Sequence, residues 1–210
     1  MNKVSLTIDG KKITADEGEK LLWVALDNDI YIPNLCGIRD NSGPSAACRL
    51  CFVEVEGKDY PVTACTEGVT EGMVVNTAGE KALSLARSGF ELIMASHPVV
   101  CAECAANRSC ELQKIARHLK MKLKTKRLRK LMQELPVDDS SDLFIHDPNK
   151  CVLCGRCVRV CGELGFAHRG FKRIVTTFQG EPLGHLKCQE CSECVSICPT
   201  GALAFKDGNQ

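Results

Sequence analysis

The sequence reads Cys151-Val-Leu-Cys154-Gly-Arg-Cys157-Val-Arg-Val-Cys161 and, later, Cys188-Gln-Glu-Cys191-Ser-Glu-Cys194-Val-Ser-Ile-Cys198-Pro199. Each stretch has the spacing C-x2-C-x2-C-x3-C, which is typical of ferredoxins that hold two [4Fe–4S] clusters. In that pattern three close thiolates bind one cluster, and the fourth cysteine binds the other. We therefore expect one cluster at Cys151, Cys154, Cys157 and Cys198, and another at Cys161, Cys188, Cys191 and Cys194. Two zinc sites are the alternative, although structural zinc more often takes separate C-x2-C pairs.

Fifteen cysteines in 210 residues form the unusual feature of the composition. An odd number in clusters favours metal binding over a disulfide framework. The N-terminus lacks the apolar stretch of a signal peptide, and no apolar run approaches the roughly eighteen residues of a membrane span. We therefore expect a cytoplasmic protein without a membrane span, where thiols stay reduced. The formal net charge of +1 would become acidic with clusters bound, because an oxidised all-cysteine cluster carries a charge of about −2.

The N-terminal part predicts a small mixed sheet with one helix. Val4, Leu6 and Ile8 alternate with polar residues before the turn Asp9-Gly10, which is a β-hairpin signal. Residues 17–29 have helical spacing, and residues 52–56 and 72–75 resemble strands. Loops rich in glycine and proline contain Cys36, Cys48, Cys51 and Cys65. This arrangement favours a β-grasp fold with a four-thiolate site, either iron–sulfur or zinc; its spacing differs from that of plant-type ferredoxins.

The middle of the chain offers three further cysteines, Cys101, Cys104 and Cys110. Residues 80–95 predict a helix, with Leu83, Ala86, Phe90 and Ile93 on one face. Three thiols cannot complete a four-iron site, and His97 stands four residues before the first of them. We therefore predict a [4Fe–4S] site held by His97, Cys101, Cys104 and Cys110. A lone histidine is usually structural or solvent-facing, which is how we interpret His118, His146, His168 and His185.

Residues 112–133 contain nine Lys or Arg residues and no acid. Leucines recur at helical intervals, so the pattern predicts a basic amphipathic linker helix over residues 120–141. A solvated face and a docking surface for an acidic partner are both open interpretations. Nucleic-acid binding is less favoured because no aromatic residues interleave the charges.

Together these motifs give a specific resemblance, carried by Ile32-Pro-Asn-Leu-Cys36, by Cys48-Arg-Leu-Cys51, by His97-x3-Cys101-x2-Cys104-x5-Cys110 and by the run from Asp147 to Cys161. The chain resembles the diaphorase small subunit of NAD-reducing hydrogenases. It is also similar to the N-terminal iron–sulfur region of the complex I large subunit and of NADH-linked [FeFe] hydrogenases. The basic run at residues 114–130 departs from this family, in which the linker is usually less charged.

The resemblance implies an α+β protein with one [2Fe–2S] cluster and three [4Fe–4S] clusters. We expect a [2Fe–2S] ferredoxin-type β-grasp domain (1–79), a helical His-and-Cys-ligated domain (80–119), the basic linker helix (120–141) and a double [4Fe–4S] ferredoxin-type domain (142–210). The chain has no glycine-rich nucleotide fingerprint and no catalytic residue of its own. It would relay electrons within an NAD(P)-linked oxidoreductase.

The implied partners are a flavin- and NAD(P)-binding subunit and a hydrogenase or other terminal redox subunit, with no nucleic acid. The same relay in a formate dehydrogenase or an electron-bifurcating complex is the first alternative. A nucleic-acid-associated protein with structural clusters, motivated by the basic run, is a more distant one.

Overall fold

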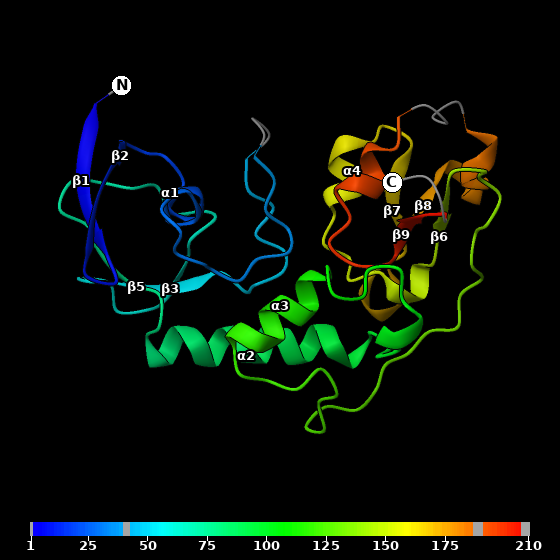
Figure 1. The fold of residues 1–210 in the computed structure, drawn as a ribbon, viewed down its shortest axis with the longest axis horizontal. Coiled ribbons are helices and arrows are strands. Elements are labelled where there is room, and N and C mark those ends of the chain that lie inside the picture. The colour runs from blue at the N-terminus through cyan, green and yellow to red at the C-terminus, as the bar shows by residue number, and fades with distance from the viewer. Residues whose placement is uncertain (1, 40–42, 187–190, 207–210) are drawn as a thin grey trace. The chain divides into compact units, whose positions relative to one another are not determined.

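The computed structural model describes residues 2–39, 43–186 and 191–206, which form two compact units. One unit contains residues 1–90 and 118–121, and the other contains residues 91–117 and 122–210. The first unit begins with β1 (Lys3–Ile8), β2 (Lys11–Asp16), α1 (Leu21–Asp27), β3 (Phe52–Val55), β4 (Val62–Thr63) and β5 (Val74–Asn76). Helices α2 (Glu80–Ala95) and α3 (Glu111–His118) each have residues in both units (Figure 1).

A five-stranded mixed sheet forms the first unit, in the order β2-β1-β5-β3-β4. The hairpin of β1 and β2 pairs Leu6 with Ile13, and its turn uses Asp9 and Gly10 at φ 49° and 82°. Two positive φ values are typical of a type I′ turn, which suits the twist of the flanking strands. Strand β1 is parallel to β5, whereas β3 is antiparallel to both β4 and β5. The predicted hairpin and mixed sheet are therefore present.

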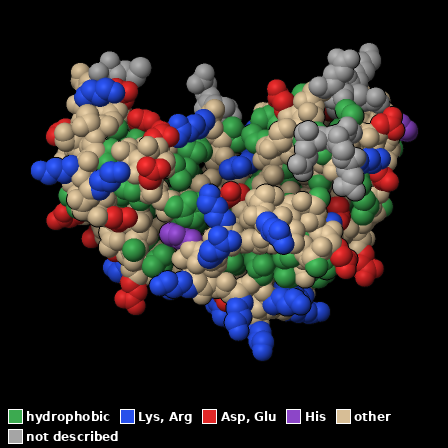
Figure 2. All heavy atoms as spheres, in the orientation of Figure 1, with side chains coloured by type: hydrophobic (Ala, Val, Ile, Leu, Met, Phe, Trp, Pro, Cys, Tyr) green, Lys and Arg blue, Asp and Glu red, His purple; other side chains and the backbone are tan. Residues whose placement is uncertain are grey.

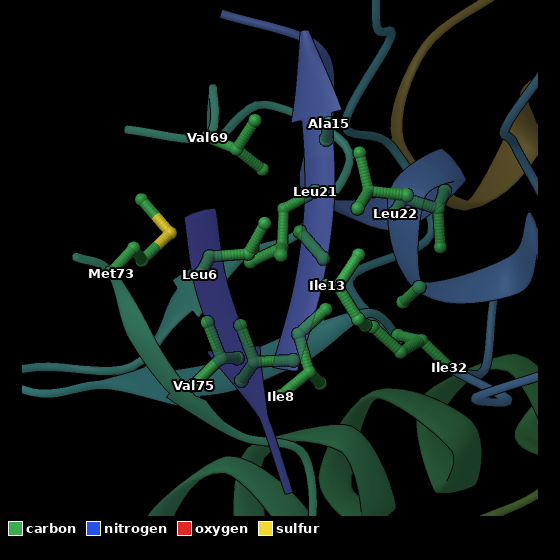
Figure 3. Close-up of a cluster of buried hydrophobic side chains, with 14 of the residues drawn as sticks. Leu6, Ile8, Ile13, Ala15, Leu21, Leu22, Ile32, Val69, Met73 and Val75 are labelled. Carbon is green, nitrogen blue, oxygen red and sulfur yellow. The ribbon is translucent and has the colours of Figure 1, made fainter. Parts of the chain in front are cut away.

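The core of the first unit lies between this sheet and α1. Leu6, Ile8 and Ile13 from the strands meet Leu21 and Leu22 from the helix, and all are buried (Figure 3). Two of the predicted site cysteines, Cys51 and Cys65, belong to the same buried cluster. The apolar core therefore reaches the cysteine loops directly.

Helix α2 has the bounds that its periodicity predicts. Its Ala86 and Phe90 are buried, while Gly89 lies against the loop between Cys48 and Cys51. A Cβ added at Gly89 would stand 2.7 Å from the carbonyl oxygen of Arg49. Glycine lowers helix propensity by about 1 kcal/mol relative to alanine, so this residue trades helix stability for close approach to a cysteine loop.

The second unit combines short elements around a core that includes cysteines. Besides the end of α2 and most of α3, it contains η1 (Cys101–Glu103), β6 (Phe144–His146), η2 (Pro148–Lys150), α4 (Arg156–Val160), β7 (Leu164–Ala167), η3 (Gly170–Lys172), β8 (Ile174–Thr177), η4 (Phe178–Gly180), η5 (Leu183–His185), α5 (Glu193–Ser196) and β9 (Leu203–Phe205). Strand β6 pairs with β9 and β7 with β8, both antiparallel. Helices α4 and α5 pack against each other.

The predicted linker helix over 120–141 is wrong, because helix α3 ends at His118 and no helix follows before η2. Lys120 has φ 54°, a left-handed conformation that ends a helix. The run also lacks acidic partners one turn away, so helical winding would only bring like charges together. Leucines at helical spacing were a misleading signal in this segment.

We call residues 122–131 the basic strap. Arg127 forms an ion pair with Glu91 on α2. Lys130 Nζ donates to the Met94 carbonyl at 2.8 Å, and the Leu131 amide donates to the Ala95 carbonyl at 2.8 Å. These donors satisfy carbonyls that the C-terminal turn of α2 leaves without helical partners. The strap thus caps α2 instead of forming a helix itself.

Within the parts of the chain that the structure describes, no helix has both the length and the apolar character needed to cross a membrane.

Candidate functional site: three groups of cysteines

Four loop cysteines come together in the first unit. The sulfurs of Cys36 and Cys48 lie 3.5 Å apart. This hydrogen-bonded contact lowers the pKa of Cys36 to about 5, with further help from the hydroxyl of Ser45 and the backbone of Cys48 and Ala47. The contact of Cys51 with Cys65 likewise lowers the pKa of Cys65. Donors directed at a sulfur favour the thiolate, which is the form that binds iron.

Helix α1 and the residue before it hold one of these cysteine loops. Lys20 Nζ donates to the Thr66 carbonyl at 3.0 Å, and the Leu22 amide donates to the Ala64 carbonyl at 3.0 Å. Ala64 and Thr66 flank Cys65. A cavity of about 160 Å³ opens beside this loop, and its lining includes both Cys36 and Cys65. The loop therefore has a rigid support and an adjoining space at the thiols.

A second group lies in the other unit, where His97, Cys101, Cys104 and Cys110 line one small cavity. The Nδ1 atom of His97 is buried and has no hydrogen-bond partner. Burial lowers the pKa of His97 to about 4, so the imidazole is neutral at pH 7. A neutral ring with a buried, unpartnered nitrogen suits a metal ligand. Gly201 fits here too, because an added Cβ would stand 2.5 Å from Cys104 Sγ.

A third group forms around a cavity lined by Cys151, Cys154, Cys157 and Cys198. Cys151 and Cys154 lie on a loop that turns sharply, since Leu153 and Gly155 have φ 53° and 77°, and Cys157 lies in the first turn of α4. Burial raises the pKa of Cys151 and of Cys157 to about 12. Iron would have to displace protons from these buried thiols, which couples metal binding to pH and to folding.

The remaining predicted ligands are less completely defined. Cys194 is buried in the hydrophobic core of the second unit, Cys161 packs against that core, and Cys191 is exposed. Cys188 lies outside the described residues. This fourth set of ligands therefore stays a prediction.

The cavities of the second and third groups are neighbours. Lys150 lines the cavity of His97, while the next residue, Cys151, lines the other; Gly201 and Thr200 are divided in the same way. The Thr200 hydroxyl donates to the Lys150 carbonyl at 3.2 Å. This hydrogen bond connects a residue that lines one cavity with a residue that lines the other. At each of these places, two consecutive residues of the chain line the two different cavities.

Among the described residues, no three His, Cys, Asp or Glu side chains converge closely enough to hold a single metal ion. A cluster differs from a single ion because its ligands surround several iron atoms.

Sequence reasoning missed the residues that shape these cavities. Gly201, Thr200 and His146 line them, and Trp23 lines the cavity of the first unit. Gly201 follows Cys198-Pro-Thr, and a glycine so near a proposed ligand could have indicated that another part of the chain packs closely against the backbone there. Trp23, although the single tryptophan, shows in sequence only as part of an amphipathic helix.

Three protein families match successive parts of the chain. Residues 1–80 match a 2Fe-2S iron-sulfur cluster binding domain. Residues 87–124 match the NADH-ubiquinone oxidoreductase-G iron-sulfur binding region, and residues 143–199 match a 4Fe-4S dicluster domain.

Curated relatives match nearly the whole chain. The NADPH-Fe(3+) oxidoreductase subunit alpha of Geobacter sulfurreducens is 38% identical over 97% of this chain, and the NADP-reducing hydrogenase subunit HndD of Solidesulfovibrio fructosivorans is 35% identical over 97%. A subunit of the NADH-quinone oxidoreductase of Rhizobium meliloti is 32% identical over 95%. The chain spans only 24%, 36% and 24% of the lengths of these three relatives.

A solved structure covers the chain more evenly. It is that of an NAD+-reducing [NiFe]-hydrogenase in the H2-reduced state, with a TM-score of 0.83 and 28% identity. The match covers 98% of this chain and 88% of that one. The chain is thus an iron–sulfur protein that resembles the iron–sulfur subunit of NAD-reducing hydrogenases and the iron–sulfur region of NADH-quinone oxidoreductases.

Proposed function

We propose that the chain is the electron-transfer subunit of an NAD(P)-linked oxidoreductase complex. It would relay electrons between a flavin- and NAD(P)-binding subunit and a hydrogenase or another terminal redox subunit. The adjacency of two ligand groups carries this proposal. The two cavities are lined by consecutive residues of the chain at two places, Lys150–Cys151 and Thr200–Gly201. Two clusters bound in these cavities would therefore be close neighbours. Relatives that are oxidoreductase and hydrogenase subunits support the same function.

We propose that the chain binds four clusters, one [2Fe–2S] and three [4Fe–4S]. The β-grasp domain would hold the [2Fe–2S] cluster, and the helical and ferredoxin-like domains would hold the others. The proposed ligands are Cys36, Cys48, Cys51 and Cys65; His97, Cys101, Cys104 and Cys110; Cys151, Cys154, Cys157 and Cys198; and Cys161, Cys188, Cys191 and Cys194. Such clusters take up and release single electrons.

The protein chain would hold the clusters, limit their contact with water and tune their reduction potentials. The cysteines of the third group are partly shielded from water, and the hydrogen-bond donors around Cys36 stabilise negative charge at the first group. Replacing one thiolate by His97 removes a negative charge from the second group, and this raises the reduction potential of a cluster. The three groups would therefore differ in potential, as a relay requires.

Partner binding is the proposed role of the basic strap. Lys122, Lys124, Lys126 and Arg129 are exposed, and Figure 2 shows Lys and Arg side chains gathered at the lower edge of the view, where Figure 1 draws this segment. The rest of the chain is net acidic, since the whole carries only +1. A basic island on an acidic protein is suited to an acidic partner surface. We propose a cytoplasmic complex without nucleic acid.

An anaerobic reduction experiment tests the function. The isolated, reconstituted chain should be reduced by dithionite but not by NADH or NADPH, because its sequence carries no glycine-rich nucleotide fingerprint. Adding the co-purifying flavoprotein should allow NADH or NADPH to reduce the clusters, since a flavin converts a hydride into single electrons. Reduction by nicotinamide with the single chain alone, or none with the flavoprotein present, would contradict the proposal. Strong salt-dependent nucleic-acid binding would instead favour the distant alternative.

A further inference from the structure

The single tryptophan of the chain, Trp23, lies beside the first group of cysteines. It is half-buried on α1 and lines the same cavity as Cys36 and Cys65. Trp23 also packs against the hydrophobic core of the unit, but the relay itself does not require an aromatic side chain beside the cysteine cavity. The position of this ring therefore calls for a reason of its own.

Two contacts fix the indole ring against the loop that carries Cys36. A Cβ added at Gly37 would stand 3.0 Å from Trp23 Cη2, so the residue after Cys36 leaves room only for the ring. The guanidinium of Arg39 lies 5.0 Å from the ring centroid, within range of a cation–π interaction. The ring is thus enclosed between the Cys36 loop and Arg39.

Arg39 is itself held by the same helix. Its guanidinium forms an ion pair with Asp27, which lies four residues after Trp23 and so on the same face of α1. The hydrogen bond that Arg39 donates to the Asp27 carboxylate raises the pKa of Arg39. Because the two charges compensate each other, the pair positions the indole without adding net charge to the site.

We propose that Trp23, positioned by Arg39 and Asp27, shields the [2Fe–2S] cluster of this unit from water and so keeps its reduction potential low. The inference rests on the proposed function, because it needs a cluster at Cys36, Cys48, Cys51 and Cys65. Reduction adds one electron and breaks no bond, and the flavin-bearing partner supplies that electron. Water stabilises the added negative charge, so a side chain that excludes water makes the cluster harder to reduce.

Redox titration of the reconstituted full chain, followed by EPR, tests this role. Trp23→Ala should shift the midpoint potential of the [2Fe–2S] signal to more positive values and should increase its deuterium coupling in D₂O. Trp23→Phe, which keeps an aromatic ring, should restore most of the original values. The double variant Asp27→Asn with Arg39→Gln removes the ion pair without changing the net charge, and it should shift the potential in the same direction as Trp23→Ala.

Tyr60→Ala is the matched control, since Tyr60 is an exposed aromatic residue of the same unit that does not line the cavity. It should leave both measurements unchanged. A wild-type [2Fe–2S] signal with unchanged potential and deuterium coupling in Trp23→Ala would overturn the inference. If Trp23→Ala fails to assemble a cluster, the Phe and double variants decide the question in the same way. A wild-type chain without any [2Fe–2S] signal would overturn the proposed function, and this inference with it.

Discussion

His97 differs from the other proposed ligands because it brings no negative charge. The variant His97→Cys should keep a [4Fe–4S] cluster but lower its potential, since an added thiolate disfavours a further electron. The variant His97→Ala should lose that cluster or convert it. EPR-monitored redox titration checks both results.

The matched control for these variants is His168→Ala, because His168 is exposed and lines neither cavity of the second unit. It should leave every signal in place. Identical spectra and potentials in wild type, His97→Ala and His97→Cys would remove His97 from the ligand set.

A second prediction concerns a substitution at Gly201. An added Cβ would stand 2.5 Å from Cys104 Sγ, so Gly201→Ala should displace that sulfur and lower iron content by the roughly four atoms of one cluster. Gly165→Ala is the control, because a Cβ at Gly165 meets nothing within 4 Å. Iron analysis after anaerobic reconstitution compares the two. Equal iron in both variants would show that Cys104 tolerates the methyl group.

These two residues also show which parts of the site a sequence can predict. The cysteines and His97 could be named because cluster ligands repeat at short, characteristic spacings. Gly201 contacts a sulfur that is almost a hundred positions away in the chain, and no local pattern encodes such a contact. The same holds for Gly89 on helix α2, whose neighbour Arg49 lies on a loop forty positions earlier in the chain.

Among the elements, predictions succeeded where packing and local preference agree. Helix α2 has the predicted bounds because its apolar face meets a core, and the first hairpin forms where Asp9-Gly10 permits a tight turn. The basic strap had leucines at helical spacing but nothing to neutralise its charges, so it lies as an irregular segment over the end of α2. Periodicity alone does not stabilise a helix in water.

The basic strap gives a prediction about partner binding. Replacing Lys122, Lys124 and Lys126 together by Glu should slow electron transfer from the flavoprotein by about tenfold or more, because charge steering acts mainly on association. Raised salt should produce a similar loss in the wild type. Stopped-flow reduction by NADH measures the rate.

Charge reversal of Lys12, Lys81 and Lys172 is the control, because these lysines are equally exposed but lie outside the strap. It should have a much smaller effect than reversal in the strap. Equal rates in both triple variants would leave the strap as a solvated segment.

At the scale of the whole molecule, the two units depend on metal to different degrees. The core of the first unit is built mainly from strands and a helix, although it includes Cys51 and Cys65. The smaller core of the second unit includes Cys194, and Cys151, Cys157, Cys161 and Cys198 pack against it. The full chain should contain about 14 iron atoms, from one [2Fe–2S] and three [4Fe–4S] clusters. Removing iron with a chelator should unfold the second unit first, since metal binding there is also folding energy.

Hydrogen exchange can follow this loss along the chain. Amides of β1 and β2 should stay protected after chelation, while those of α4 and α5 should exchange rapidly. Equal loss of protection in both units would show that the first also needs its metal to fold.

Cys198 lines the same cavity as Cys151, Cys154 and Cys157, and this arrangement has a consequence for the synthesis of the protein on the ribosome. At a synthesis rate of about 5–20 residues per second, the roughly forty residues between the third and fourth thiols take about 2–8 s to appear. During that time three thiols leave the ribosome without the fourth. Cluster loading must therefore wait until Cys198 has been synthesised, or a carrier must protect the three thiols until then.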